Sequence, residues 1–469
     1  MRKLCTLLIF LSFGIGTTFA QSEMELLATW SDPTLPPGTQ YNNTYNEVWG
    51  FVSNGHEYAV IGSTMGTHIL DVTDTDNVFE RQFIEGASAG GHIVHRDYHD
   101  FQGYLYAVAD ESGGGTVSTL QIIDISGLPD NDAITVYDDD DLIRETHNIF
   151  IDTTTAKLYA LAAKGGDSGY KAMKIYSLAD PVDPVKIGQY GVIGGEGFGH
   201  VHDAFVDNDK AFLNCGGDGL FIVDFSGDDP ELLARYTTND YPESGYNHSG
   251  WPTPDLSHYY FADETWGTAM KVVNVNEFTE IELSNTLFNA GNEDDNSIAH
   301  NQVVHCGKLY VSYYYDGLQV YDLADPENPV REAYYSTSQI PVRENYEGAW
   351  GVYPFLPSGN IIVSDMQEGF FLLKGITDNC STPVATKEEI LDLAVTIYPN
   401  PTSGDFTIKF DGKIEQLDIT NLQGESMKGM FSFDGDVVRA NTDLSSGIYL
   451  VHIQSSIAST TKRIMIVGE

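Results

Sequence analysis

Histidine opens a short strand pattern five times along the chain, each time followed by a small polar or acidic residue. These histidines are His99, His147, His202, His248 and His300. Imidazole nitrogens are good ligands for zinc, copper or iron, so side chains of this type gathered in a ring could hold a divalent transition metal. Because ligands spread around a ring cannot all reach one ion at ~2.1 Å, we expect three or four of them to bind.

Acidic side chains stand two residues before several of these openings. Side chains two apart on a strand point the same way, so Glu47, Asp97 and Glu145 are expected beside the ring, together with His200 as a further candidate ligand. The carboxylates could orient metal ligands or act as general bases in a hydrolytic or oxidative reaction.

Two further openings carry tryptophan followed by glycine instead of histidine. We expect them and the polar residues beside the histidines to line a channel and contact a ligand there: Trp49, Asp100, Asn148, Asp203, Asn301 and Trp350. A purely structural role explains the same pattern, because repeated His-Asn and His-Asp pairs can hydrogen-bond neighbouring strands and ordered water with no ion present. Both interpretations stay open at this point.

The seven openings are regularly spaced, which defines the element that must position them. Neighbouring openings are 50, 48, 55, 46, 52 and 50 residues apart, and each is followed by an apolar strand such as LFIVD at 220–224. Short strands with a period near 50 are typical of a β-propeller in which each repeat is one blade. The sequence therefore predicts an all-β fold with a seven-bladed propeller.

The last repeat lacks a fourth strand, and a matching strand occurs at the other end of the chain. Residues 25–30 (ELLATW) closely resemble residues 231–236 (ELLARY), a fourth strand. We expect this N-terminal strand to pair into the final blade and close the ring, since closure removes two open sheet edges.

The net charge of the chain and its first 20 residues indicate its possible partners and its cellular location. The 68 acidic residues outnumber the 24 basic ones and give a net charge of −44, which disfavours nucleic acid and anionic membranes as partners. Residues 1–20 carry Arg2 and Lys3, an apolar run and a small-residue end at Ala20, the pattern of a secretory signal peptide. No later stretch is long and apolar enough for a transmembrane segment.

The C-terminal part has a different character. Residues 378–394 are polar and predict a linker, and the short alternating strands of residues 395–469 predict a small Ig-like β-sandwich. Its motif residues are Tyr398, Pro399, Asn400, Pro401, Gly404, Gly447 and Tyr449. This piece resembles the type A sorting domain of the type IX secretion system. The resemblance implies handling by that machinery and export across the outer membrane of a Bacteroidetes-type bacterium, with release or surface attachment.

The repeats also have a family resemblance. Residues 221–224 (FIVD) match the core of the LVIVD repeat, whereas Ser177, Asn274 and Lys374 replace its aspartate in three blades. The whole arrangement resembles the secreted choice-of-anchor B family, in which a common propeller is joined to different C-terminal anchors. The resemblance implies architecture and destination and assigns no chemistry.

We therefore expect a signal peptide at 1–20, a propeller at 21–377, a linker at 378–394 and a sorting domain at 395–469. The expected function is that of an exported or cell-surface module that binds a ligand or protein partner. The alternative is a metal-dependent hydrolase or oxidase with zinc, copper or iron at the histidine ring. Whether the protein is an enzyme stays open.

Overall fold

The computed structural model divides the chain into two compact units, Met1–Thr377 and Asp378–Glu469. It describes residues 22–376 except 167–168, 276–277, 279 and 289–296, and it describes the strands of the second unit over much of 396–466. The signal peptide predicted at 1–20 and the linker predicted at 378–394 lie outside the described residues. Every helix or strand assigned among the described residues is a strand.

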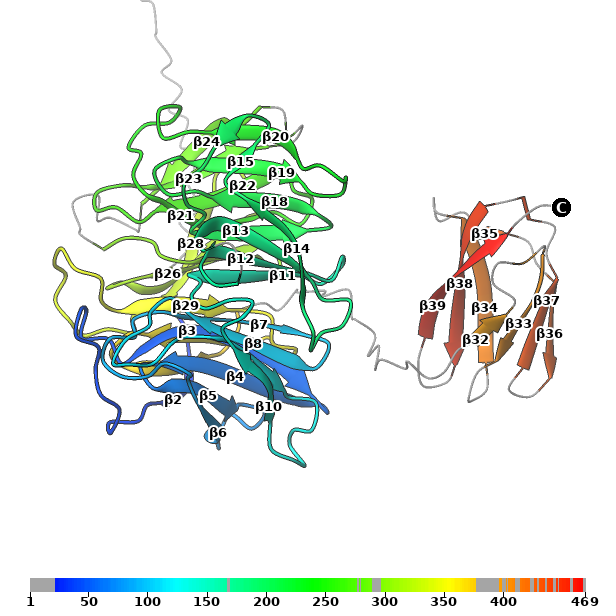
Figure 1. The fold of residues 1–469 in the computed structure, drawn as a ribbon, viewed down its shortest axis with the longest axis horizontal. Coiled ribbons are helices and arrows are strands. Elements are labelled where there is room, and N and C mark those ends of the chain that lie inside the picture. The colour runs from blue at the N-terminus through cyan, green and yellow to red at the C-terminus, as the bar shows by residue number, and fades with distance from the viewer. Residues whose placement is uncertain are drawn as a thin grey trace, which may run out of the picture. The chain divides into compact units, whose positions relative to one another are not determined.

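The first unit is built from sheets of antiparallel strands that follow one another along the chain (Figure 1). The first three sheets contain β3 (Tyr45–Ser53), β4 (His56–Ser63), β5 (Gly66–Asp71) and β6 (Phe79–Glu85); β7 (Arg96–Phe101), β8 (Tyr104–Ala109), β9 (Leu120–Asp124) and β10 (Ile134–Asp139); and β11 (Asn148–Asp152), β12 (Lys157–Ala163), β13 (Lys171–Ser177) and β14 (Val185–Tyr190). A small hairpin of β15 (Val192–Ile193) and β16 (Glu196–Gly197) follows.

The next sheets repeat the same order. They contain β17 (Asp203–Asp207), β18 (Lys210–Asn214), β19 (Leu220–Asp224) and β20 (Glu231–Tyr236); β21 (Asn247–Pro252), β22 (His258–Asp263), β23 (Met270–Asn274) and β24 (Glu282–Leu287); and β25 (Gln302–His305), β26 (Lys308–Tyr313), β27 (Gly317–Asp322) and β28 (Val330–Tyr335). Chain order and neighbour order coincide in each sheet, as hairpin connections require.

The last sheet joins the two ends of the unit. It contains β29 (Ala349–Tyr353), β30 (Ile361–Asp365) and β31 (Gly369–Leu373), and β2 (Leu26–Trp30) pairs antiparallel with β31. The two-residue β1 (Ser22–Glu23) adds in parallel to β28. The first strands contact one another in the series β3, β7, β11, β17, β21, β25 and β29, and β29 in turn contacts β3.

The middle strands of each sheet are buried on both faces, which explains their continuous apolar runs. In β19, Leu220 and Ile222 pack towards the following sheet, against a cluster that contains Tyr259. Phe221 and Val223 of the same strand pack towards the preceding sheet, against a cluster that contains Tyr159. Alternate side chains of one strand thus supply two interfaces between sheets.

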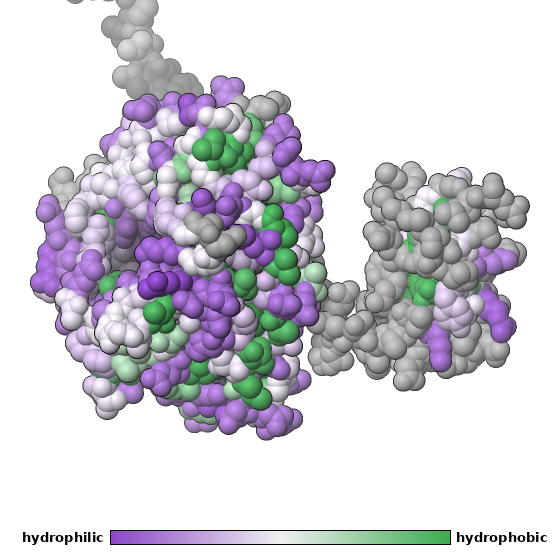
Figure 2. Space-filling view, viewed as in Figure 1, coloured by the Kyte–Doolittle hydropathy of each residue, from purple (hydrophilic) through white to green (hydrophobic). Residues whose placement is uncertain are grey.

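The outermost strands face solvent on one side, so exposed and half-buried residues alternate along them. Val185 and Ile187 of β14 are 58% and 52% exposed, whereas the alternate residues Lys186, Gly188 and Tyr190 are half-buried. On the face drawn in Figure 2, hydrophilic side chains cover most of the first unit, with apolar side chains between them. No helix among the described residues is long and apolar enough to cross a membrane.

The described strands of the second unit form two four-stranded sheets. One contains β32 (Thr396–Tyr398), β33 (Asp405–Lys409), β37 (Val437–Asn441) and β36 (Met430–Asp434), and the other contains β35 (Ser426–Met427), β34 (Ile414–Asn421), β38 (Gly447–Ser455) and β39 (Ser459–Ile466). Ile408 and Val438 of the first sheet share one buried cluster with Ile419 and Val451 of the second. The predicted motif residues Tyr398, Gly404, Gly447 and Tyr449 are described, whereas Pro399, Asn400 and Pro401 lie outside the described residues.

Candidate functional site

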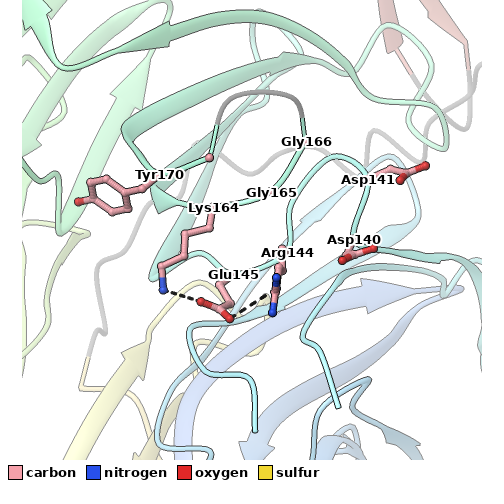
Figure 3. A pocket seen from close by; sticks show the side chains of 9 residues that line it. Asp140, Asp141, Arg144, Glu145, Lys164, Gly165, Gly166 and Tyr170 are labelled. Carbon is pink, nitrogen blue, oxygen red and sulfur yellow. Dashed lines mark hydrogen bonds and ion pairs between the residues drawn. The ribbon is translucent and has the colours of Figure 1, made fainter. Parts of the chain in front are cut away.

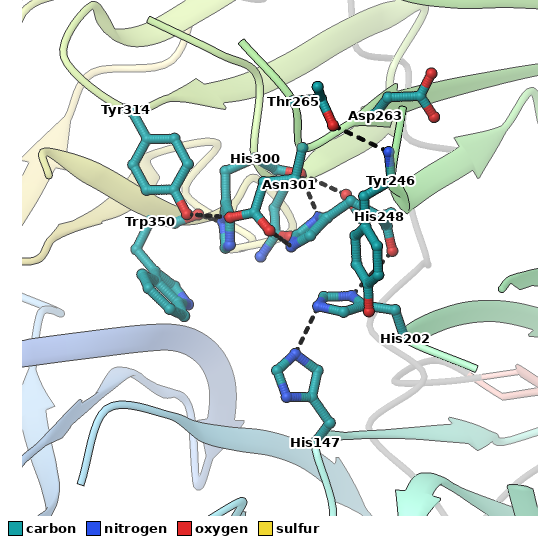
Figure 4. Close-up of polar contacts among 12 residues, drawn as sticks. His147, His202, Tyr246, His248, Asp263, Thr265, His300, Asn301, Tyr314 and Trp350 are labelled. Atoms are coloured by element: carbon teal, nitrogen blue, oxygen red, sulfur yellow. Dashed lines mark hydrogen bonds and ion pairs between the residues drawn. The ribbon is translucent and has the colours of Figure 1, made fainter. Parts of the chain in front are cut away.

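The first strands of the first unit surround a cavity of about 250 Å³, which we call the histidine pocket. Its walls are formed by Gln40, Tyr41, Val94, His95, Glu111, His147, His202, His248, Glu264, His300, Tyr314, Tyr346 and Trp350. Figure 4 shows the imidazoles of His147, His202, His248 and His300 converging from separate strands.

The imidazoles follow one another in a ring. Ring centroids are 4.1 Å apart from His95 to His147 and from His147 to His202, 4.0 Å from His202 to His248, and 4.4 Å from His248 to His300. The indole of Trp350 completes the series, 4.5 Å from His300 and 5.4 Å from His95. Each residue comes from the start of a different first strand, so the ring follows from the repeated strand geometry.

Three of these histidines have a fixed tautomer. Nδ1 of His202 lies 3.1 Å from the carbonyl oxygen of His248, Nδ1 of His248 lies 3.0 Å from that of His300, and Nδ1 of His300 lies 2.6 Å from that of Trp350. A carbonyl only accepts, so each Nδ1 carries the hydrogen and each Nε2 of a neutral ring keeps a lone pair. Burial lowers the pKa of His202 and His248 well below the usual value and that of His300 to about 3, which keeps all three neutral.

His147 differs because an acidic group touches it. Its Nδ1 lies 2.8 Å from Oδ2 of Asp110, and its Nε2 lies 2.6 Å from Nε2 of His202. Since Nε2 of His202 can only accept, both nitrogens of His147 donate and the ring is a cation. Burial alone would lower the pKa of His147, but the hydrogen bond and charge of Asp110 outweigh it and raise that pKa. Burial would likewise raise the pKa of Asp110, yet the contact with His147 lowers it to about 2.

Two glutamates complete the polar lining. Glu264 follows β22; its Oε1 accepts a hydrogen bond of 2.6 Å from the Tyr314 hydroxyl, and its Oε2 lies 3.7 Å from Nε2 of His248. Glu111 follows β8 and accepts a hydrogen bond of 3.2 Å from the backbone N–H of His95. Burial raises the pKa of both carboxyl groups to about 7. Nδ1 of His95 is buried and has no hydrogen-bond partner among the described residues.

A second, smaller cavity of about 70 Å³ is also lined by the first strands, and we call it the carboxylate pocket. Glu47, Asp97 and Asp203 line it, and burial raises the pKa of Glu47 to about 8, that of Asp97 well above its usual value, and that of Asp203 to about 7. Oε2 of Glu47 accepts a hydrogen bond of 2.8 Å from Nδ2 of Asn301, and Oδ2 of Asp97 accepts one of 2.7 Å from the N–H of Ile149.

Most of the predicted channel residues lie at this second pocket. The ring of Trp49 packs at a tilt against that of His99, with centroids 4.3 Å apart, and its Nε1 donates to Oδ1 of Asp100 over 2.9 Å. Asn148 lines the same pocket, and its Nδ2 donates to the carbonyl of His202. Trp350 lies in the histidine pocket instead, and Asp100 lines neither pocket but accepts the hydrogen bond from Trp49.

The predicted metal ligands are therefore divided between two places. His147, His202, His248 and His300 lie together, whereas His99 is the fourth residue of β7 and belongs to the carboxylate pocket. The histidine that completes the ring in that sheet is His95, one residue before β7, just as His147 and His202 stand one residue before β11 and β17. His200 lies beside the ring, its centroid 5.9 Å from that of His202, with Nδ1 3.1 Å from the Tyr170 hydroxyl.

The candidate base Glu145 lies at neither channel pocket. It faces an open surface pocket of about 850 Å³, where Nζ of Lys164 lies 2.5 Å and Nε of Arg144 3.8 Å from its oxygens (Figure 3). Two cations hold this carboxylate, so it is poorly placed to serve the histidines.

Sequence reasoning did not find Asp110, Glu111 or Glu264. A signal was present: the tripeptide Ala-Asp-Glu occurs at 109–111 and again at 262–264, each time at the end of a second strand. In both repeats the glutamate reaches the histidine pocket.

Comparison with known proteins identifies the second unit. Residues 396–467 match the secretion system C-terminal sorting domain family. The chain is therefore a cargo of type IX secretion, which delivers it to the cell surface or the exterior. No curated protein matches the sequence.

Similar solved structures concern the fold. The periplasmic gluconolactonase of Pseudomonas aeruginosa has a TM-score of 0.50 at 11% identity, covering 90% of this chain and 99% of that one. The β-propeller domain of Myceliophteria thermophila Cps50 (Swd1) has a TM-score of 0.45 at 10% identity, covering 68% and 94%. A Lactobacillus plantarum protein has a TM-score of 0.46 at 12% identity, covering 84% and 99%. The repeated four-stranded sheets, whose first strands contact one another in series, give the first unit the architecture of a β-propeller. The likeness to the gluconolactonase shows a shared fold.

Proposed function

We propose that this protein is an exported β-propeller that binds a small polar ligand in its histidine pocket. The observation that carries the proposal is the ring of His95, His147, His202, His248 and His300 around one cavity. Backbone carbonyls occupy Nδ1 of His202, His248 and His300, so each Nε2 is an acceptor. Nε2 of His202 already accepts from His147, which leaves Nε2 of His248 and His300 for a ligand. Histidines that served only to hydrogen-bond neighbouring strands through Nδ1 would not need to face a shared cavity with their Nε2 atoms.

The lining indicates the class of ligand. Its polar groups are mostly acceptors, namely imidazole lone pairs and the carboxyl groups of Glu111 and Glu264, so a ligand rich in hydroxyl donors fits it. Tyr41, Tyr346 and Trp350 add aromatic walls that can pack against an apolar ring face. The volume of about 250 Å³ is below that of a drug-sized site. A monosaccharide meets these three conditions.

Calorimetric titration of the secreted protein tests this proposal. The protein is freed of metal with EDTA and titrated with glucose, galactose, mannose, xylose and N-acetylglucosamine. We expect at least one sugar to bind and Trp350→Phe to weaken that binding at least tenfold, whereas Trp49→Phe, at the carboxylate pocket, leaves it unchanged. Absence of binding by all five sugars, or equal weakening by both variants, would contradict a sugar site at the histidine pocket.

The finer architecture and family belong to the same proposal. Seven sheets joined by contacts from β3 around to β29 and back to β3 support a closed, seven-bladed ring. The pairing of β2 with β31 supports closure by the N-terminal strand. The LVIVD-like motifs support membership in the choice-of-anchor B family, and the composition of residues 1–20 supports a cleaved signal peptide.

A second candidate function is a metal-dependent hydrolase or oxidase. It is favoured by the ring nitrogens of His202 and His248 and a carboxylate oxygen of Glu264, which lie within 4.8 Å of one another. Sites with three protein ligands leave coordination positions for water or substrate, as in catalytic metal centres. Hydrolysis of p-nitrophenyl acetate and oxidation of a phenol, each with and without added Zn²⁺ or Cu²⁺, would distinguish an enzyme from a binding module.

A further inference from the structure

We propose that His202, His248 and Glu264 bind one divalent transition metal ion, such as Zn²⁺, inside the histidine pocket. The inference rests on the proposed function only in placing the ion in the same pocket. It names a second kind of ligand for that pocket, and it stands or falls on metal measurements that need no sugar.

The donor atoms are close to the spacing that a metal requires. One ring nitrogen from each histidine and one oxygen of Glu264 lie within 4.8 Å of one another, and Nε2 of His248 is 3.7 Å from Oε2 of Glu264. Two ligands at ~2.1 Å in a tetrahedral site are separated by roughly 3.4 Å. The set therefore needs shifts of about 1 Å or less in side-chain position to close on an ion.

The protonation state suits metal binding. Both histidines give their Nδ1–H to a backbone carbonyl of the next sheet, which leaves Nε2 as a lone-pair donor. A ligating histidine almost always donates its other N–H in this way, because the contact fixes the ring orientation and raises its basicity. Here the fixing groups are backbone atoms of His248 and His300, so they are independent of side-chain conformation.

The carboxylate is held in the same manner. The Tyr314 hydroxyl donates to Oε1 of Glu264 over 2.6 Å, which leaves Oε2, the oxygen nearer to His248, available to an ion. Two imidazoles and one carboxylate suit zinc, iron, cobalt, nickel or copper better than calcium or magnesium, which prefer oxygen ligands alone.

His147 competes for one of the donors. Its Nε2 is 2.6 Å from Nε2 of His202, closer than two ligands of one ion would lie. An ion on His202 therefore replaces this hydrogen bond, and His147 stays outside the ligand set, held by Asp110. The remaining space of the pocket leaves room for water at the open coordination positions.

Zinc titration of the secreted protein tests the site. The protein is stripped with dipicolinate, dialysed and titrated with Zn²⁺ alone by calorimetry, with the bound metal counted by elemental analysis. We expect one Zn²⁺ per chain in the wild type. His248→Gln and Glu264→Gln should each weaken binding at least 100-fold, whereas His99→Gln, a buried histidine of the carboxylate pocket, should leave it unchanged.

A milder variant keeps the test informative where a ligand substitution prevents folding. Tyr314→Phe retains the ring and removes only the hydroxyl that holds Glu264, so we expect Zn²⁺ binding to weaken 10- to 100-fold. Absence of stoichiometric zinc in the wild type would overturn the site, and so would binding unchanged by His248→Gln, Glu264→Gln and Tyr314→Phe. Because sugar binding is measured in metal-free protein, failure of the zinc site leaves the proposed function standing, and the reverse also holds.

Discussion

Replacement of Glu47 by glutamine should change how the stability of the propeller depends on pH. Glu47 lies in the carboxylate pocket with Asp97, Asp203 and His99, and burial raises the pKa of its carboxyl group from 4.5 to about 8. In the unfolded chain the same group titrates at its usual value, so between pH 4.5 and pH 8 the folded state binds more protons than the unfolded state. The free energy of unfolding therefore falls as pH rises through this window.

The size of the effect follows from the shift. Each pKa unit corresponds to 1.36 kcal/mol, so the carboxyl group of Glu47 lowers the free energy of unfolding by about 4 kcal/mol between pH 5 and pH 8. For a unit of 377 residues, roughly 2.1 cal/mol/K of unfolding entropy per residue converts this into about 5 °C of Tm. Glutamine cannot ionise, so in the Glu47→Gln variant the free energy of unfolding does not fall in this way as pH rises.

Glutamine also has a cost that does not depend on pH. The two oxygens of Glu47 accept hydrogen bonds from Asn301 Nδ2 and from the N–H of Val48, at 2.8 and 2.9 Å. The amide of glutamine offers only one acceptor, so one donor loses its partner at about 1–2 kcal/mol. We expect the variant to melt roughly 1–3 °C below the wild type at pH 5 and 2–4 °C above it at pH 8.5.

Differential scanning calorimetry of both proteins from pH 5 to pH 9 measures this difference. Glu231→Gln on the exposed end of β20 is the matched control and should follow the wild type at every pH. A Tm difference between Glu47→Gln and wild type that stays constant over this range would refute the burial argument.

Three further substitutions probe the framework of the propeller. Lys271 and Asp263 form an ion pair of 2.8 Å with both side chains fully buried, so Lys271→Met should lower the free energy of unfolding by about 3–5 kcal/mol, measured by urea unfolding. A β-carbon on Gly351 would lie 1.9 Å from Oε1 of Glu47, so Gly351→Ala should lower Tm and abolish the pH dependence assigned to that glutamate. Proline at Ala28 in β2 should increase amide exchange in β31 without affecting β19, read by mass spectrometry.

The fold class and the destination could be predicted because they depend on local signals. Apolar runs bounded by turn residues predicted the strands, and the all-β fold is confirmed. The motif from Tyr398 to Gly404 and its partners predicted the sorting domain, which the match at 396–467 confirms. Neither conclusion required knowledge of which side chains meet in space.

The membership of the histidine ring could not be predicted fully. His95, Asp97 and His99 alternate along one stretch and share a direction, so strand periodicity cannot choose among them. The His-Asp pair at 99–100 copies the pair at 202–203 and favoured His99. The two differ in position along the strand: the ring residues, His95 included, lie within two residues of the start of their first strands, whereas His99 is the fourth residue of β7.

The glutamates of the histidine pocket could not be predicted from the sequence for another reason. Glu264 and Glu111 follow second strands, and they meet His248 and His95 of their own sheets only because antiparallel pairing brings the end of the second strand beside the start of the first. Glu47 and Asp97, in contrast, line the carboxylate pocket and not the histidine pocket. Spacing along one strand predicts the direction in which a side chain points. The depth of that side chain in the channel depends on the register between neighbouring strands.

The pairing of β2 with β31 imposes a sequence of events on biosynthesis. A chain that leaves its synthesis or translocation site amino end first presents Leu26–Trp30 long before Gly369–Leu373 exists, and until then the opening segment has nowhere to dock. During this interval both β2 and the open edge of the unfinished last sheet are unpaired, and they can pair with the corresponding strands of another copy of the chain. Chains truncated before residue 369 should therefore associate by strand exchange. Correct folding of the exported protein thus depends on completion of its last repeat.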